Sequence, residues 1–303
     1  MKWRARSLAV FLVAVFSVVS EVARADVVTN LSVLQAVTRD PPEAGFVADA
    51  SVKYPMIINL AFGKSGTTSL TETLKKMGFN PVHWYIGFEL TDALTQFGRM
   101  DLLENPFPNG RNNSQGYAHG RIVDVVLNTI KNGESLEVLS ALDSSTENKF
   151  RAFTEIPMWE WPECKYPQIT HLDELVRLNP NAKYILTVRE IHSHVHSMIE
   201  WRHKPRDMGG DMARCANLSL ENDQIMQLEL EKWVTDTNNQ LKKRMSAFRP
   251  PVPLLELEVS EDPISKLMWH VFPDGRVPPQ VEYEMKRRND RFPRTNVNQK
   301  AHV

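Results

Sequence analysis

A short segment rich in glycine and hydroxyl side chains has the composition of an anion-binding loop. It follows an apolar run and reads Gly-Lys-Ser-Gly-Thr-Thr-Ser over residues 63–69. Glycine allows the sharp turn that brings successive backbone N–H groups near an anion, and a helix that begins directly afterwards adds the positive end of its dipole. The alternative is an ordinary strand-to-helix turn in which Ser and Thr cap the helix. The candidate anion-binding residues are Gly63, Lys64, Ser65, Gly66, Thr67, Thr68 and Ser69.

This segment fits only part of the pattern that is typical of enzymes acting on nucleoside triphosphates. That pattern is Gly-x-x-x-x-Gly-Lys-Ser/Thr. Residues 63–65 fit its end, but Ile58 stands where the first glycine belongs. A later apolar run leads into Arg189 and not into an acidic residue that could hold magnesium. A P-loop kinase or NTPase is therefore the weaker alternative.

Short apolar runs alternate with helical periodicity along the chain. Strands are expected at 56–61, at 150–156, at 183–188, at 252–259 and in a short segment ending near His83. Helical spacing of apolar residues starts at Leu70 and returns at 122–129, 172–178, 193–202 and 226–241. Strands that alternate with helices predict an α/β fold of three layers, with a central, mostly parallel sheet flanked by helices.

A second candidate anion contact follows the run at 183–188. Ligands of parallel sheets bind beyond the carboxyl ends of the strands, so Arg189 should face the same crevice as Lys64. Ser197 lies eight residues after Arg189, in a segment with helical spacing. A planar guanidinium and a hydroxyl together suit a tetrahedral phosphate.

Taken together, these two elements resemble the sulfotransferases that use 3′-phosphoadenosine 5′-phosphosulfate (PAPS) as sulfuryl donor. The string Lys-Ser-Gly-Thr-Thr-Ser-Leu at 64–70 is similar to their 5′-phosphosulfate loop, and Arg189 with Ser197 is similar to their 3′-phosphate pair. The resemblance extends more weakly over about 54–294. It implies a P-loop-like fold, PAPS as co-substrate and in-line transfer with no metal and no covalent enzyme intermediate.

The resemblance is closer to the Golgi and carbohydrate-type branches than to the cytosolic ones. The Arg-Lys-Gly block that the cytosolic branch carries near its C-terminus has no counterpart here. Arg287 and Arg288 either supply a substitute cation or belong to a solvated charged tail. Lys64 is expected to neutralise the charge that develops on the bridging oxygen as the sulfuryl group leaves.

An alcohol acceptor also needs a base to take its proton. His83 follows Lys64 by 19 residues, at a distance comparable to that of the base in one branch of the family. Glu155 should reach the same sheet edge and could bind the acceptor or act as base. Each has an ordinary alternative, a half-buried turn histidine or a solvated carboxylate. His119 and Asp143 are weaker candidates, because neither can be placed at a strand end.

Tryptophans and histidines elsewhere suggest two further sites. Trp84, Trp159 and Trp161 could form a stacking wall for sugar rings, although tryptophan most often fills a core or rim. The four histidines at 192, 194, 196 and 203 lack the glutamate of a His-Glu-x-x-His zinc site, so no metal is expected.

The N-terminus has the pattern of a secretory signal peptide. Basic residues precede an apolar run at 8–19, and Ala23-Arg24-Ala25 is typical of a cleavage site. The run is shorter than the roughly 20 residues of a membrane span, so cleavage is favoured over an uncleaved anchor. The expected organisation is a signal peptide or short anchor at 1–25, a lead-in segment at 26–53 and a sulfotransferase domain at 54–303.

Such a leader places the chain in the Golgi lumen or outside the cell. In an oxidising compartment Cys164 and Cys215 could pair, which two cysteines alone do not decide. Sequons begin at Asn30, Asn112 and Asn217. The formal net charge of −1 gives no overall basic field, so neither nucleic acid nor an anionic membrane surface is an expected partner.

The expected function is that of a sulfotransferase of class EC 2.8.2.-, which moves a sulfuryl group from PAPS to a hydroxyl, or an amine, of a glycan or small-molecule acceptor in the secretory pathway. A nucleotide enzyme of the kinase or NTPase type is one alternative. A non-catalytic secreted protein that retains the fold is the other.

Overall fold

The computed structural model describes residues 46–84, 88–103, 121–142, 149–203 and 206–293. The chain divides into two compact units, Met1–Glu43 and Ala44–Val303, and every described residue belongs to the second. The expected leader, the sequons at Asn30 and Asn112 and the candidates His119 and Asp143 lie outside the described residues. None of the described helices is long and apolar enough to cross a membrane.

Five parallel strands form the central sheet, in the spatial order β3-β4-β2-β5-β8. Successive residues of a strand point to opposite faces, and in β2 the side chains of Ile57 and Ile58 enter two different apolar clusters. The sheet therefore has a buried layer on each side, as its apolar strands predict. Its strands are β2 (Ile57–Asn59), β3 (Asn80–His83), β4 (Lys149–Glu155), β5 (Lys183–Val188) and β8 (Leu254–Glu258).

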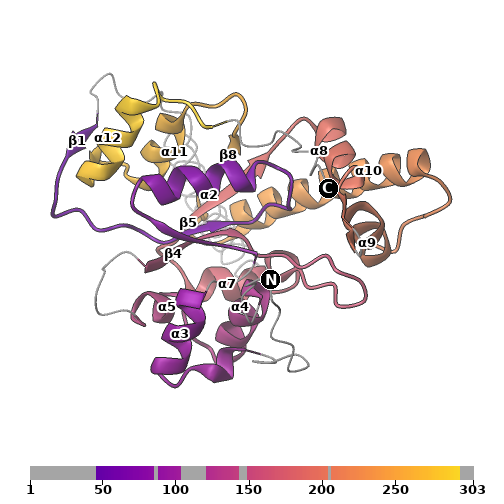
Figure 1. Cartoon of the computed structure of the whole chain (residues 1–303), viewed down its shortest axis with the longest axis horizontal. Helices are drawn as coiled ribbons and strands as arrows, with labels where there is room; N and C mark the ends of the chain where they lie inside the picture. Colours follow the sequence, from indigo (N-terminus) through magenta and orange to yellow (C-terminus); the bar gives the residue numbers. More distant parts are fainter. Residues whose placement is uncertain (1–45, 85–87, 104–120, 143–148, 204–205, 294–303) are drawn as a thin grey trace, which may run out of the picture. The chain divides into compact units, whose positions relative to one another are not determined.

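Helices cover both faces of this sheet (Figure 1). One face packs against α2 (Thr67–Lys76), α11 (Ile264–Val271) and α12 (Pro279–Arg287). The opposite face packs against α3 (Phe88–Gln96), α4 (Ile122–Lys131), α5 (Glu137–Ser140), α7 (Leu172–Leu178) and the end of α10 (Asp223–Ala247), with η1 (Met100–Leu102) beside α4. The predicted three-layer α/β fold is confirmed.

A third apolar cluster lies beyond the carboxyl ends of the strands. It joins α8 (Ile191–Ile199), α9 (Met208–Cys215) and the first half of α10 to Phe62 and Trp159. These three helices therefore enclose the side of the fold on which the candidate anion-binding loop lies. The remaining short elements are α6 (Pro167–Thr170), β6 (Arg202–His203) with β7 (Arg206–Asp207), and β1 (Val47–Ala48) with β9 (Arg276–Val277).

Several boundaries differ from those expected from the sequence. The strand expected at 56–61 pairs only over Ile57–Asn59, because the chain leaves the sheet to form the loop. The helix expected from Leu70 already begins at Thr67. Val47 and Ala48, inside the expected lead-in segment, form a short parallel pairing with β9.

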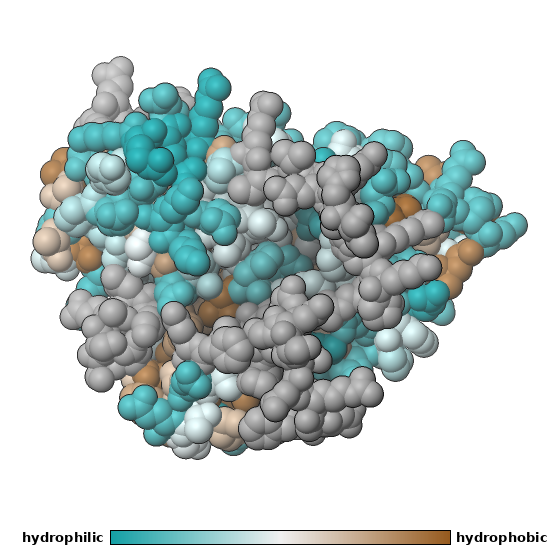
Figure 2. Space-filling model, viewed as in Figure 1, coloured by the Kyte–Doolittle hydropathy of each residue, from teal (hydrophilic) through white to brown (hydrophobic). Residues whose placement is uncertain are grey.

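Hydrophilic residues cover most of the described part of the face seen in Figure 2. The large apolar side chains that are exposed on the described chain, such as Trp161 and Leu228, do not belong to its core clusters. Isolated exposed apolar residues of this kind are normal in folded proteins.

Candidate active site

The loop between β2 and α2 has the backbone of an anion cradle. Lys64 has φ +68° and Gly66 has φ +102°, so both lie in the left-handed region. A Cβ atom on Gly66 would come within 2.9 Å of Val259 Cβ, and one on Gly63 within 2.6 Å of Glu155 Oε1. Gly66 is therefore required both by its positive φ and by its close contact with Val259, whereas the atoms nearest to a Cβ on Gly63 are the ends of the flexible side chains of Glu155 and Met208.

A buried polar network fixes this loop to the sheet. Ser65 Oγ donates to Phe62 O (2.7 Å) and lies 2.8 Å from Thr187 Oγ1. Asn59 Nδ2 donates to Thr187 Oγ1 (3.1 Å) and to Thr154 O (2.9 Å), so the side chain links β2 to both neighbouring strands. The Ser65 hydroxyl is thus used inside the protein, and the group that Ser65 can offer an anion is its backbone N–H.

The other hydroxyls of the segment have different surroundings. Thr67 Oγ1 donates to Glu155 Oε2 (2.7 Å), Thr68 is exposed and Ser69 is buried. The N-cap residue of α2 is Gly66, which has no side chain, so neither Ser nor Thr occupies the N-cap position of the alternative interpretation.

Lys64 is the cation of this loop. Its Nζ lies 4.7 Å from the centre of the Trp201 ring, a cation–π distance. Burial lowers the pKa of Lys64, the Glu155 carboxylate opposes that shift and the Arg189 guanidinium adds to it. The Lys64 ammonium is thus partly desolvated, with one anion and a second cation nearby.

Arg189 directly follows β5, the strand beside β2. Its charge reaches both Lys64 and the buried His194, whose pKa values it lowers. Arg189 is half-buried and makes no hydrogen bond or ion pair with another described residue. The chain leaves β2 and β5 toward opposite edges of the sheet, and ligands bind at such a point.

Ser197 lies on α8, which follows Arg189. It is half-buried, and its hydroxyl makes no hydrogen bond within the described parts of the chain. The N-terminus of α8 is capped by Glu190, which accepts from the N–H groups of His192 and Ser193. A hydrogen bond from the Ser193 side chain, together with these two backbone bonds, lowers the pKa of Glu190 to about 2. No described contact joins Ser197 to Arg189.

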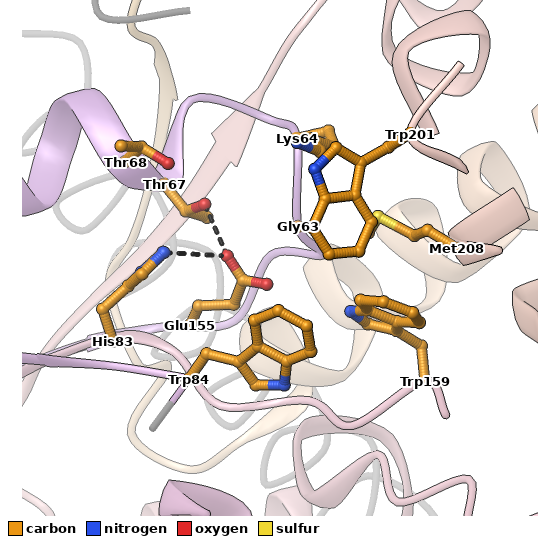
Figure 3. A pocket seen from close by; sticks show the side chains of 10 residues that line it. All are labelled: Gly63, Lys64, Thr67, Thr68, His83, Trp84, Glu155, Trp159, Trp201 and Met208. Carbon is orange, nitrogen blue, oxygen red and sulfur yellow. Dashed lines mark hydrogen bonds and ion pairs between the residues drawn. The ribbon is translucent and has the colours of Figure 1, made fainter. Parts of the chain in front are cut away.

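His83 and Glu155 lie together at the ends of β3 and β4. His83 Nε2 is 3.5 Å from Glu155 Oε2, and the dashed lines in Figure 3 mark this pair and the bond from Thr67. The Glu155 side chain is only 7% exposed and that of His83 is 27% exposed. The solvated carboxylate that the sequence also allowed for Glu155 is therefore wrong.

His194 holds α8 against the loop. It is buried, and its Nε2 donates to the carbonyl oxygen of Gly63 at 2.8 Å. Burial lowers its pKa to about 4, so this histidine is neutral at pH 7. Its place in a histidine-rich segment had suggested only a metal ligand, and the described residues contain no group of three His, Cys, Asp or Glu side chains that could hold a metal ion.

A pocket of about 140 Å³ opens beside the loop (Figure 3). Trp84 lies 4.9 Å from Trp159 and 5.9 Å from Trp201, measured between ring centres, and Met208 lines the same pocket. The pocket-lining residues are Gly63, Lys64, Thr67, Thr68, His83, Trp84, Glu155, Trp159, Trp201 and Met208. The three tryptophans therefore form an aromatic wall, Lys64 lies over the Trp201 ring, and His83 and Glu155 also line the pocket.

The sequence-based interpretation of the pocket was wrong for one tryptophan and missed two residues. Trp161 is 54% exposed and does not line the pocket, whereas Trp201 does. Trp201 lies directly before, and Met208 directly after, the short hairpin that follows α8, which no sequence pattern had predicted. Neither residue type alone signals a site, since both usually fill cores.

The two cysteines form a disulfide, with Cα atoms 5.5 Å apart. It links the segment after Trp159 to the C-terminal end of α9, the helix that begins at Met208. The disulfide thus connects the segments that carry Trp159 and Met208, which both line the pocket. Asn217, the described sequon asparagine, is exposed two residues after Cys215.

Arg287 and Arg288 do not act as a free cation pair. Both pair with the buried Glu284 on the same helix, Arg287 at 2.7 Å and Arg288 at 3.3 Å. The guanidinium groups are held by this carboxylate, so the hypothesis of a substitute nucleotide contact has no support in the structure.

Comparisons with known proteins give little beyond this geometry. No protein-family model matches the chain, and no curated protein matches it. Among solved structures, the chain matches the crystal structure of sulfotransferase STF9 from Mycobacterium avium, with 12% sequence identity and a TM-score of 0.35. The match covers 79% of this chain and 68% of that chain. Similarity at this level assigns no function, so the function must be argued from the site itself.

Proposed function

We propose that this protein is a PAPS-dependent sulfotransferase. The observation that carries the proposal is the position of Lys64 and Arg189 beyond the ends of two adjacent strands, with Arg189 in no ion pair with a described residue. Two nearby cations repel each other, and an anionic ligand removes that cost. A donor with separate phosphate groups at its 3′ and 5′ positions offers an anion to each.

In this proposal the loop binds the 5′-phosphosulfate through the N–H groups of residues 63–69 and the N-terminus of α2. Arg189, with Ser197 on α8, binds the 3′-phosphate. When bound, the donor supplies the sulfuryl group. Lys64 stabilises the negative charge on the oxygen from which that group departs.

The proton of the acceptor goes to His83 in this arrangement. His83 Nε2 faces the pocket, and the imidazolium formed by proton uptake would lie 3.5 Å from the Glu155 carboxylate. Glu155 then stabilises the positive charge of His83 rather than taking the proton itself. Thr67 donates to the same carboxylate oxygen, Oε2, and the charge of Lys64 lies near the carboxylate.

The aromatic wall favours an acceptor with a ring. Trp84, Trp159 and Trp201 offer flat faces on which a sugar or an aromatic ring can stack. The indole nitrogen of Trp159 is buried and makes no hydrogen bond with a described residue. In Figure 3 it is turned toward the space beside Trp84, where it can donate to an oxygen of the acceptor.

The secretory pathway is the compartment that we propose for this reaction. The disulfide between Cys164 and Cys215 supports it, because disulfides persist mainly in oxidising compartments. An exposed Asn217 in a sequon is accessible to a glycosylating enzyme.

Ligand-dependent unfolding tests the nucleotide assignment. Adenosine 3′,5′-bisphosphate should raise the melting temperature more than ADP with magnesium, and Arg189→Ala should remove most of the difference. Arg177→Ala is the matched control, since Arg177 is an exposed arginine in the last turn of α7. A larger stabilisation by ADP with magnesium would instead favour a kinase or NTPase.

Turnover tests the reaction itself. The protein is incubated with sulfur-labelled PAPS and a panel of neutral glycans, anionic glycans and phenols, and labelled products are separated and counted. Binding of the bisphosphate without transfer to any acceptor would favour the non-catalytic alternative.

A further inference from the structure

His83 has a second pair of neighbours on the side away from Glu155. Its Nδ1 lies 3.3 Å from Thr71 Oγ1 and 3.3 Å from Thr154 Oγ1. Thr71 belongs to α2, and Thr154 is a fully buried residue of β4. The imidazole is thus held between two hydroxyls at Nδ1 and one carboxylate at Nε2.

The hydrogen atoms of these hydroxyls are already required elsewhere. Thr71 Oγ1 lies 2.7 Å from the carbonyl oxygen of Thr67, Thr154 Oγ1 lies 3.1 Å from that of Val82, and the two hydroxyl oxygens are 2.7 Å apart. A carbonyl oxygen can only accept a hydrogen bond. The hydrogen atoms in these three oxygen–oxygen contacts must therefore come from the two threonine hydroxyls, which have one each. Neither hydroxyl has a hydrogen left for His83, and Nδ1 must therefore be the donor.

We propose that Thr71 and Thr154 are positioning residues that hold neutral His83 in the Nδ1–H tautomer, with the lone pair of Nε2 free to take the proton of the acceptor. The inference that the threonines support catalysis rests on the proposed transferase function. The tautomer of His83 can be measured whether or not the protein is a transferase. Neither threonine touches the reacting groups, and both act through His83.

The charged groups around His83 show why such positioning is needed. Glu155 on β4 faces Nε2, and Lys64 on the loop lies near Glu155. A neutral imidazole without the threonines would place its hydrogen on Nε2 and donate to the carboxylate, which would block the base. The two hydroxyl oxygens compete for that hydrogen at Nδ1 and so keep Nε2 available.

In the transfer step the bond that forms is matched by a bond that breaks, and the acceptor proton has a defined destination. The acceptor oxygen forms a bond to sulfur, the bond from sulfur to the bridging oxygen of the donor breaks, and its electron pair stays on the donor phosphate. The acceptor proton moves to Nε2. The resulting imidazolium donates from Nδ1 to the threonine oxygens and from Nε2 toward Glu155.

Nitrogen-15 NMR of the histidine-labelled full chain tests the tautomer directly. The resonances of His83 are identified by comparison with His83→Gln, and the spectrum above pH 7.5 should show a protonated Nδ1 and an unprotonated Nε2. In Thr71→Val/Thr154→Val we expect the proton to move to Nε2. A wild-type spectrum with the proton on Nε2 would overturn the proposal.

Turnover separates positioning from simple structural damage. Thr71→Val/Thr154→Val should lose about tenfold or more in kcat, as expected when a general base is impaired, with the affinity for adenosine 3′,5′-bisphosphate unchanged. Thr71→Ser/Thr154→Ser keeps both oxygens and should recover most of the rate. Thr129→Val is the control for folding, because Thr129 is a buried helical threonine with the same 2.7 Å bond to the carbonyl four residues back.

Two results would count against the threonines even if PAPS transfer is confirmed. One is an unchanged kcat in the double valine variant while His83→Ala is inactive. The other is equal loss in the valine and serine variants. A protein that shows the assigned tautomer but transfers no sulfuryl group would contradict the proposed function and leave the tautomer assignment intact.

Discussion

Lys64 has two features that are unfavourable in the folded protein. A lysine with a φ of +68° is strained, and the burial of its ammonium lowers the pKa. Neither feature stabilises the folded chain. Both are expected for a side chain that, in the proposed function, points at an anion from the turn of the loop.

The first prediction concerns this side chain. Lys64→Ala should lower kcat by about 100-fold or more, in the range found when one donor to a developing oxyanion is removed. The rate is measured with labelled PAPS and the acceptor that gives most product. Lys75→Ala is the control, since Lys75 is exposed near the end of α2, the helix that follows the loop. Near-normal turnover of Lys64→Ala would rule out its catalytic role.

At this scale the sequence predicted the types of residues better than their partners. Lys64, His83, Glu155 and Arg189 were expected at one sheet edge because they follow strands, and the structure places Lys64 near Glu155 and Arg189, and His83 beside Glu155. That Ser65 would bond to Thr187 was not predictable, because Thr187 is 122 residues away and its direction depends on the register of β5 with β2.

At the scale of elements, the residue that follows β8 restricts the loop between β2 and α2. Val259, directly after that strand, packs against Gly66. The sequence predicted a strand at 252–259, but not its contact with the loop, because strand order in a parallel sheet is decided by long-range packing. Local apolar runs predict where strands form, but they do not predict which strands lie side by side.

Replacing Gly66 and Gly133 by alanine separates the cost of the contact with Val259 from the cost of a positive φ. Gly66→Ala and Gly133→Ala both place Ala at positive φ, which costs about 1–2 kcal/mol. Only Gly66 has a neighbour in the way, so Gly66→Ala should destabilise by roughly 1–3 kcal/mol more. Urea denaturation measures both. Equal losses would show that the Val259 contact is relieved without cost.

The disulfide gives a second prediction at this scale. Cys164→Ser/Cys215→Ser should lower the free energy of unfolding by about 2–4 kcal/mol. The disulfide connects the segments that carry Trp159 and Met208, so the KM for the acceptor should rise while the Kd for adenosine 3′,5′-bisphosphate stays nearly constant. Calorimetric titration and steady-state rates measure the two quantities. A parallel weakening of both would contradict the assignment of this wall to the acceptor.

For the molecule as a whole, acid stability depends on two neutral histidines, the buried His194 and the half-buried His270. Burial lowers the pKa of His194 and of His270 to about 4. In the unfolded chain a histidine has a pKa near 6.5, so between these values the unfolded state binds more protons than the folded state. The free energy of unfolding must therefore fall as the pH falls from 6.5 toward 4.

The expected loss is roughly 1.5 kcal/mol for each histidine between pH 6.5 and pH 5. His194→Gln keeps an N–H donor near Gly63 and removes the titration, so it should flatten the pH dependence by about half. His196→Gln, which changes an exposed histidine of the same helix, should leave the slope unchanged. Denaturation curves at several pH values measure the slopes. Identical slopes in both variants and the wild type would contradict a neutral, buried His194.

The contact between Lys64 and Trp201 gives the protein an internal optical probe. A charged ammonium 4.7 Å from an indole ring alters the emission of that ring. If an anion draws Lys64 away, the fluorescence of Trp201 changes without any added label. Donor affinity can then be titrated on the unmodified chain, before a single acceptor has been identified.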